Sequence, residues 1–118
     1  MCIRDRFWSA TAFNSQLVWD TSSVTDMGGT FSGANGFNSE LAWDTSSVTT
    51  MESMFYTTEA FNQPLDWDTS KVTSMFRFFY NTALASDECS KAEMWEAWNG
   101  VDAFTSEYDW SAYSVSDC

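Results

Sequence analysis

Apolar and polar positions recur along this chain with a period of 24 residues. The string WDTSSVT occurs at residues 19–25 and again at 43–49, and it returns as WDTSKVT at 67–73. A fixed period of this length is typical of repeat proteins, in which each unit packs against its neighbours. The residue types shared by three successive units are Asn14, Asn38 and Asn62; Trp19, Trp43 and Trp67; Val24, Val48 and Val72; Met27, Met51 and Met75; and Phe31, Phe55 and Phe79.

The apolar spacing changes within each unit. Leu65 and Trp67 alternate with Asp66, which predicts a short strand with one buried face. From Val72 onward, apolar residues follow at Met75 and at positions 78 and 79, which is the spacing of a short helix. One strand and one helical turn cannot bury both apolar faces alone. The sequence therefore predicts an α/β solenoid, a leucine-rich-repeat-like stack of short parallel strands and short helices with a helical C-terminal cap.

Three sets of equivalent residues, one Asp, one Trp and one Asn per repeat, could bind a ligand or could serve the structure alone. Asp20, Asp44 and Asp68 fall between the predicted strand and helix, where a carboxylate can accept N–H bonds, so we interpret them as caps and as weak calcium candidates. The Trp column is interpreted as core, although stacked aromatic faces also bind sugars. The Asn column is interpreted as an internal ladder of bonds to the backbone, with ligand contact as the alternative.

The repeat divides the chain into three parts. Residues 1–6 (MCIRDR) hold two of the five basic residues and resemble a translated sequencing adapter, so we expect them to be an artefact. Residues 7–84 are predicted to form an array of about three 24-residue units after a partial first unit, as a fragment of a longer protein. Residues 85–118 are predicted to cap that array, because an open end would expose core and unpaired backbone.

The predicted cap has its own signals. Ser90 and Glu93 have the spacing of a capping box at a helix start, with Met94 and Trp98 on one face after it. A disulfide between Cys89, just before this helix, and Cys118 would tie the aromatic tail back onto the cap. The alternative is two free thiols in a reducing compartment.

Composition excludes several classes of function. The formal charge is -12, which disfavours binding to nucleic acid and to anionic membrane surfaces. No apolar run approaches the roughly 20 residues that span a bilayer, so we expect no direct membrane insertion. The chain has no His and therefore no His-based catalytic or metal set. We expect no catalytic residues, no cofactor and no enzymatic activity, with a carboxylate-based glycoside hydrolase as a distant alternative.

From Phe7 to Leu84 the units follow the pattern F-N-x-x-L-x-W-D-x-S-x-V-T-x-M-x-x-M-F-x-x-A, and there the chain resembles this branch of the BspA-like family of leucine-rich-repeat-type surface proteins. The first unit departs from the pattern at Gly28, Gly29 and Thr30. The resemblance implies a secreted or cell-surface location and an adhesion-like role as a module that binds a protein or glycan. The alternative is a structural spacer without a ligand. An exposed patch of non-repeating aromatic residues would favour the module, and a uniformly polar surface would favour the spacer.

Overall fold

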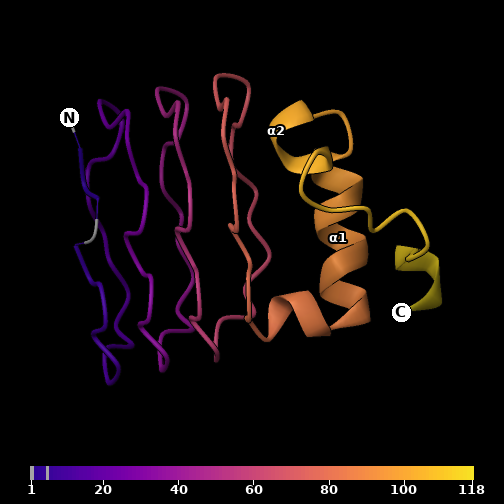
Figure 1. Ribbon diagram of the computed structural model, residues 1–118, viewed down its shortest axis with the longest axis horizontal. Helices are drawn as coiled ribbons and strands as arrows, with labels where there is room; N and C mark the ends of the chain where they lie inside the picture. Colours follow the sequence, from indigo (N-terminus) through magenta and orange to yellow (C-terminus); the bar gives the residue numbers. More distant parts are fainter. Residues whose placement is uncertain (1, 5) are drawn as a thin grey trace.

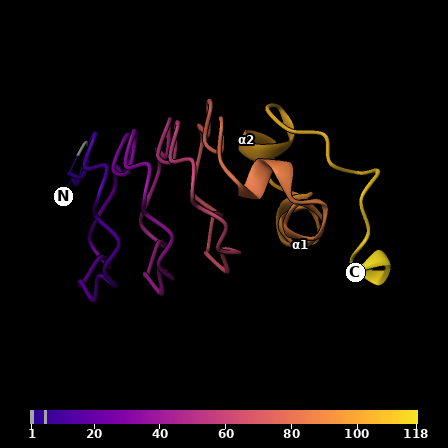
Figure 2. The same cartoon turned by 90° about the horizontal axis from the view of Figure 1, so that it is seen from below.

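The computed structural model describes residues 2–4 and 6–118, and within them all regular helices follow residue 83 (Figure 1). Before that point the chain forms loops that lie side by side along the long axis of the molecule, as the two perpendicular views agree (Figures 1 and 2). The N-terminal and C-terminal ends lie at opposite ends of this axis. The helical elements are η1 (Leu84–Ser86), α1 (Glu88–Trp98), α2 (Asp102–Thr105) and η2 (Val115–Asp117).

The predicted α/β solenoid is wrong. The described residues contain no sheet, and the segment around Leu65 and Trp67 is irregular where a strand was expected. The helix expected after Val72 is also absent, because the chain forms turns there, as it does at the equivalent positions of the other repeats. Parallel pairing is limited to isolated bridges, which are Cys2 with Asp26, Asp26 with Thr50, and Thr50 with Ser74.

The backbone hydrogen bonds explain why the turns do not become helices. In an α-helix every N–H bonds to the carbonyl four residues earlier. Here alternate N–H groups bond outside their own repeat: Phe55 N donates to the Phe78 carbonyl of the next repeat at 3.1 Å. The following group, Tyr56 N, donates back to the Ser53 carbonyl at 3.2 Å. A helix cannot form when every second amide is committed to a neighbouring repeat.

Left-handed residues make this alternation possible. Ser53 has a φ of 53° and Thr57 has a φ of 54°. The backbone therefore changes from the right-handed to the left-handed conformation twice within one turn segment. In the first unit the equivalent positions are Gly29 and Gly33, where the left-handed conformation carries no Cβ penalty. Gly29, which departs from the repeat pattern, thus suits the backbone of the turn.

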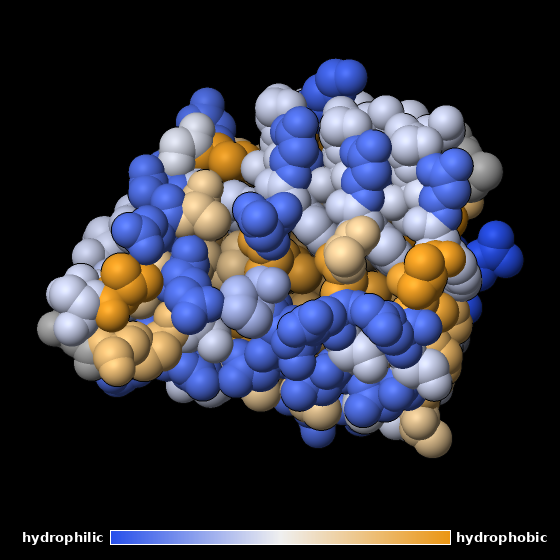
Figure 3. Space-filling model, turned by 180° about the vertical axis from the view of Figure 1, so that it is seen from behind, coloured by the Kyte–Doolittle hydropathy of each residue, from blue (hydrophilic) through white to orange (hydrophobic). Residues whose placement is uncertain are grey.

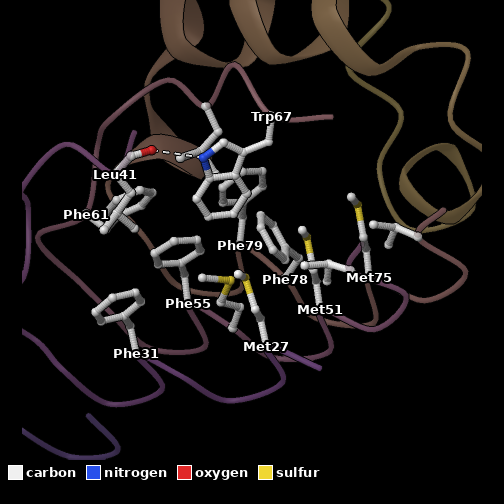
Figure 4. Close-up of a cluster of buried hydrophobic side chains, with 14 of the residues drawn as sticks. Met27, Phe31, Leu41, Met51, Phe55, Phe61, Trp67, Met75, Phe78 and Phe79 are labelled. Atoms are coloured by element: carbon white, nitrogen blue, oxygen red, sulfur yellow. Dashed lines mark hydrogen bonds between the residues drawn. The ribbon is translucent and has the colours of Figure 1, made fainter. Parts of the chain in front are cut away.

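Equivalent apolar side chains stack into columns inside the loops (Figure 4). Phe31 and Phe55 stack with ring centroids 5.6 Å apart, and Phe55 and Phe79 follow at 6.2 Å. The Met column and the Val column are buried beside them. Each fully buried side chain of this size contributes about 1.5–3 kcal/mol relative to an exposed one. These columns are the continuous core of the array.

The Trp column borders that core. The Trp43 indole N–H donates to the Leu17 carbonyl at 3.0 Å. The Trp67 indole N–H donates in the same way to the Leu41 carbonyl at 2.9 Å, a bond drawn in Figure 4. Both indoles are buried, whereas Trp19 is 39% exposed. The column therefore links neighbouring repeats through its ring stacking and through the indole hydrogen bonds.

The described part of the segment 1–6 continues the same arrangement. Ile3 is buried at the position equivalent to Met27, and its N–H donates to the Asp26 carbonyl at 3.0 Å. The adapter origin of this segment stays a prediction, and two of its residues, Met1 and Asp5, lie outside the described residues.

Helix α1 lies across the last loop. Trp98 stacks on Phe79 with ring centroids 6.2 Å apart. The helix begins three residues earlier than the predicted capping box, because Asp87 is the N-cap and its carboxylate accepts from Ser90 N at 3.0 Å. A carboxylate at this position satisfies one of the free N–H groups of the first turn.

Candidate functional site

The structure places the predicted calcium candidates in separate turns. The Asp44 Oδ1 atom accepts from the Ser46 hydroxyl at 2.6 Å and from Ser46 N at 3.0 Å. Asp20 and Asp68 hold equivalent turns with the serines two residues after them. The serine hydroxyl and then the serine N–H lower the pKa of all three carboxyls. Among the described residues no group of three acidic or Cys side chains could hold a metal ion.

The Asn column forms a ladder that continues into the cap. The Asn14 side-chain oxygen accepts from Asn38 N, and the Asn38 oxygen accepts from Asn62 N, both at 2.8 Å. The Asn62 oxygen accepts from the Ser90 hydroxyl at 2.6 Å. This side-chain oxygen is therefore occupied by a structural bond in each of the three repeats.

Exposed aromatic side chains gather on the outer side of the turns. Trp8 is 66% exposed, Phe76 is 49% exposed and Tyr80 is 53% exposed. A hollow of about 390 Å³ lies on this surface. We call it the aromatic furrow, and its lining includes Trp8, Ser32, Ser53, Tyr56, Phe76 and Arg77.

The furrow has an ordered aromatic wall. Tyr56 lines the furrow and stacks on Tyr80, which lies outside the lining, with ring centroids 5.0 Å apart and planes 13° from parallel. The Arg77 guanidinium carbon lies 5.9 Å from both of these ring centroids and 5.0 Å from that of Phe76. Cation–π attraction of this kind holds the guanidinium over the rings. The wall is thus built from rings that support one another, with one positive charge among them.

The other side of the furrow carries hydrogen-bonding groups. Glu52 belongs to its lining, and one of its carboxylate oxygens accepts from the Ser74 hydroxyl at 2.6 Å. Ser32 and Ser53 add hydroxyl groups. The furrow therefore combines aromatic side chains with hydrogen-bonding groups, and the described part of its lining carries two arginines, Arg4 and Arg77, and one carboxylate, Glu52.

A family model described as "Mycoplasma protein of unknown function, DUF285" matches residues 2–92. The chain belongs to this family. DUF285 is related to the BspA-like surface proteins, so the predicted relationship is confirmed at that level, without a particular repeat branch. No curated protein and no solved structure matches the chain.

Two further features of this DUF285 chain concern its cysteines and its helices. Cys89 and Cys118 form a disulfide, and Cys2 is a free, exposed cysteine. Among the described residues, none of the helices has both the length and the apolar character needed to cross a membrane.

The aromatic furrow is absent from the sequence-based candidates. Sequence reasoning followed columns in which every repeat carries the same residue, but positions 8, 32, 56 and 80 of this DUF285 chain carry Trp, Ser, Tyr and Tyr. Those four positions are spaced by the same period of 24. Aligning the outward positions as well as the apolar ones would have shown an aromatic column interrupted at Ser32.

Proposed function

We propose that this DUF285 protein is a non-catalytic extracellular or cell-surface module that binds a protein or a glycan through the aromatic furrow. The observation that carries the proposal is the exposure of Trp8 and Phe76 around one hollow. Exposing large aromatic side chains has a cost in water, and such side chains supply much of the binding energy in known interfaces.

The proposed location has two supports. The family is related to surface proteins, and a disulfide persists in oxidising compartments such as the cell exterior. We also assign the chain to the BspA-like branch with the F-N-x-x-L-x-W-D-x-S-x-V-T repeat, because each complete unit follows that pattern closely.

The alternative is a structural spacer with no ligand. A spacer requires only a soluble exterior, and rows of hydrophilic residues do cross one face of the molecule (Figure 3). Hydrophobic residues gather between those rows on the same face, so the surface is not uniformly polar. The spacer also gives no reason for the aromatic furrow. No observation on the described residues favours the hydrolase.

The proposal is tested by binding of the purified protein to arrays of glycans and extracellular-matrix proteins. We expect the wild-type protein to bind, and the double variant Trp8→Ala/Tyr56→Ala to lose at least tenfold in affinity. Val18→Ala is the matched control, because Val18 is exposed but does not line the furrow. Circular dichroism checks that the variants are folded. Failure of the wild-type protein to bind any component would support the spacer and overturn the proposal.

A further inference from the structure

The aromatic furrow gathers positive charge in a chain that is strongly acidic. The whole sequence has 5 basic and 17 acidic residues. Among the described residues that line the furrow, Arg4 and Arg77 are basic and Glu52 alone is acidic. The balance of charge at this surface is therefore the reverse of that in the rest of the chain, and it favours a ligand that carries a negative group.

The charged groups of the furrow differ in their partners. The Arg4 guanidinium forms an ion pair with Asp26 at 3.2 Å, and the Glu52 carboxylate accepts from the Ser74 hydroxyl. Arg77 makes neither an ion pair nor a side-chain hydrogen bond with any other residue that the structure describes. Its guanidinium therefore keeps its N–H donors for a ligand.

Three rings hold the Arg77 guanidinium in place. Its central carbon lies 5.0 Å from the ring centroid of Phe76 and 5.9 Å from those of Tyr56 and Tyr80. Cation–π attraction constrains the side chain without using its N–H groups as hydrogen-bond donors to oxygen. A side chain that is already constrained loses less freedom when a ligand binds, so its hydrogen bonds contribute more to affinity.

The donors of Arg77 favour a carboxylate. A guanidinium presents its N–H groups in a planar fork that matches the two oxygens of a carboxylate or of a phosphate. The net charge of the chain is -12, and Glu52 adds a negative charge within the furrow itself. A ligand group with a single negative charge meets less repulsion here than a phosphate or a polyanion. One carboxylate is thus the best match.

The residues around Arg77 indicate the source of that carboxylate. Trp8 and Phe76 are exposed, and Tyr56 lies with them in the lining. Aromatic residues and Arg are enriched in protein–protein interfaces, where Trp, Tyr and Arg supply most of the binding energy. We infer that the furrow binds a segment of a partner protein in which an Asp or Glu side chain pairs with Arg77 and a neighbouring apolar side chain packs on the rings. This inference rests on the proposed function and narrows its ligand to a protein.

A display library of random peptides, selected on the purified wild-type protein, tests the inference. The selected peptides are synthesised with their acidic residue and with Asn or Gln in its place, and isothermal titration calorimetry measures their affinities. The protein variant is Arg77→Gln. Lys71→Gln is the matched control, because it removes the same charge from an exposed residue outside the furrow. A hyaluronan hexasaccharide serves as the probe for a carboxylate on a sugar.

We expect the selected peptides to share an Asp or Glu beside an apolar residue. They should bind Arg77→Gln at least tenfold more weakly than wild type and should bind Lys71→Gln like wild type. The amide forms of the peptides should also lose at least tenfold on the wild-type protein, and Arg77→Gln should weaken them little further, because the two groups form one pair. The substitution in the peptide tests the pair even if Arg77→Gln does not fold.

Two results would overturn the inference by themselves: selected peptides that share no acidic residue, or acidic peptides whose affinity does not change in Arg77→Gln. Tighter binding of the hyaluronan probe than of any peptide would also overturn it and would assign the furrow to an acidic sugar. If the wild-type protein bound a component of the arrays but selected no acidic peptide, this inference would fail and the proposed function would stand. If it bound nothing in either experiment, both would fail.

Discussion

At the scale of single residues, the carboxylates of the Asp column each hold the turn that follows them. Hydrogen bonds from the serine two residues later lower the pKa of Asp20, Asp44 and Asp68 in the folded protein. A depressed pKa means that the folded state favours the ionised carboxylate. These hydrogen bonds therefore stabilise the folded protein at pH values above 3.8, the ordinary pKa of Asp. The stabilisation is lost as the pH falls through the folded-state pKa.

The lowered pKa values predict how the stability of the triple variant Asp20→Asn/Asp44→Asn/Asp68→Asn depends on pH. The substitution keeps an acceptor oxygen but removes the charge, so the variant should be less stable than wild type at pH 6. The difference should shrink as the pH falls below 3.8 and vanish once the pH lies below the folded-state pKa, where both proteins carry neutral side chains at these positions. Urea denaturation at a series of pH values measures it, in about 0.5 M NaCl so that the general repulsion within this acidic chain is screened.

A second triple variant controls for the lost charge. Glu40→Gln/Glu59→Gln/Asp66→Asn removes three exposed acids that lie outside the column. It should remain close to wild type in the same salt at every pH. If both variants lost the same stability at each pH, the Asp–Ser turns would contribute nothing to the free energy of unfolding beyond the effect of their charge.

At the scale of elements, the helical cap supplies a bond that the next repeat would otherwise provide. Phe55 N bonds to a carbonyl of the following repeat, whereas Phe79 N, its equivalent in the last loop, donates to the Tyr108 hydroxyl at 2.8 Å. Burial raises the pKa of Tyr108 to about 12, so this hydroxyl stays protonated across the physiological range. Tyr108 therefore acts as a neutral substitute for a backbone carbonyl.

Tyr108→Phe should remove this bond and leave the ring packing intact. The expected loss is about 1–3 kcal/mol in the free energy of unfolding, because Phe79 N then lacks its acceptor. Amide hydrogen exchange should also accelerate at Phe79. Tyr113→Phe is the control, since the Tyr113 hydroxyl bonds to Lys91 at 3.3 Å and does not contact Phe79. Unchanged protection of the Phe79 amide in Tyr108→Phe would contradict this role.

The repeat elements also show which parts of the fold could be predicted from the sequence alone. The period of 24 predicted that like residues meet, and Phe31, Phe55 and Phe79 do stack in order. It could not reveal that alternate amides bond to the neighbouring repeat, because the apolar spacing of such turns matches that of a helix. Ser53 and Thr57 adopt left-handed conformations without being glycine, so they give no local signal.

The candidate site was harder to predict than the core. Burial imposes the same residue type on every repeat, and this makes the core columns visible in one sequence. Trp8 is exposed, Tyr56 is half-buried and Ser32 is buried, so this equivalent position has a different environment in each repeat and carries different residues. Their meeting in one hollow depends on the path of the turns, and the sequence-based prediction had that path wrong.

At the scale of the whole molecule, the array and the cap are joined through several different groups. Leu65 N donates to the Met94 sulfur at 3.3 Å, and the Asn ladder ends on Ser90. Both contacts come from α1, which is tied to the C-terminal residue through the disulfide of Cys89 with Cys118. The tail between α1 and the disulfide includes Tyr108, so the bond that covers Phe79 lies within the closed loop.

Breaking this closed loop should weaken the whole fold. The two cysteines are separated by 29 residues, for which the chain-entropy model gives about 3–4 kcal/mol of stabilisation. We expect Cys89→Ser/Cys118→Ser to lower the urea midpoint by the corresponding amount and to increase hydrogen exchange at Phe79, because Tyr108 is less constrained. Reduction of the wild-type protein should produce the same shift.

Cys2→Ser is the matched control, because Cys2 is exposed and unpaired. It should leave the urea midpoint of the oxidised protein unchanged. A double variant with the wild-type midpoint would show that packing of Trp98 and Met94 alone secures the cap. A lowered urea midpoint with unchanged hydrogen exchange at the Phe79 amide would instead show that the disulfide does not hold Tyr108 against the last loop. The position of Tyr108 would then depend on its packing against Phe104 and Trp110.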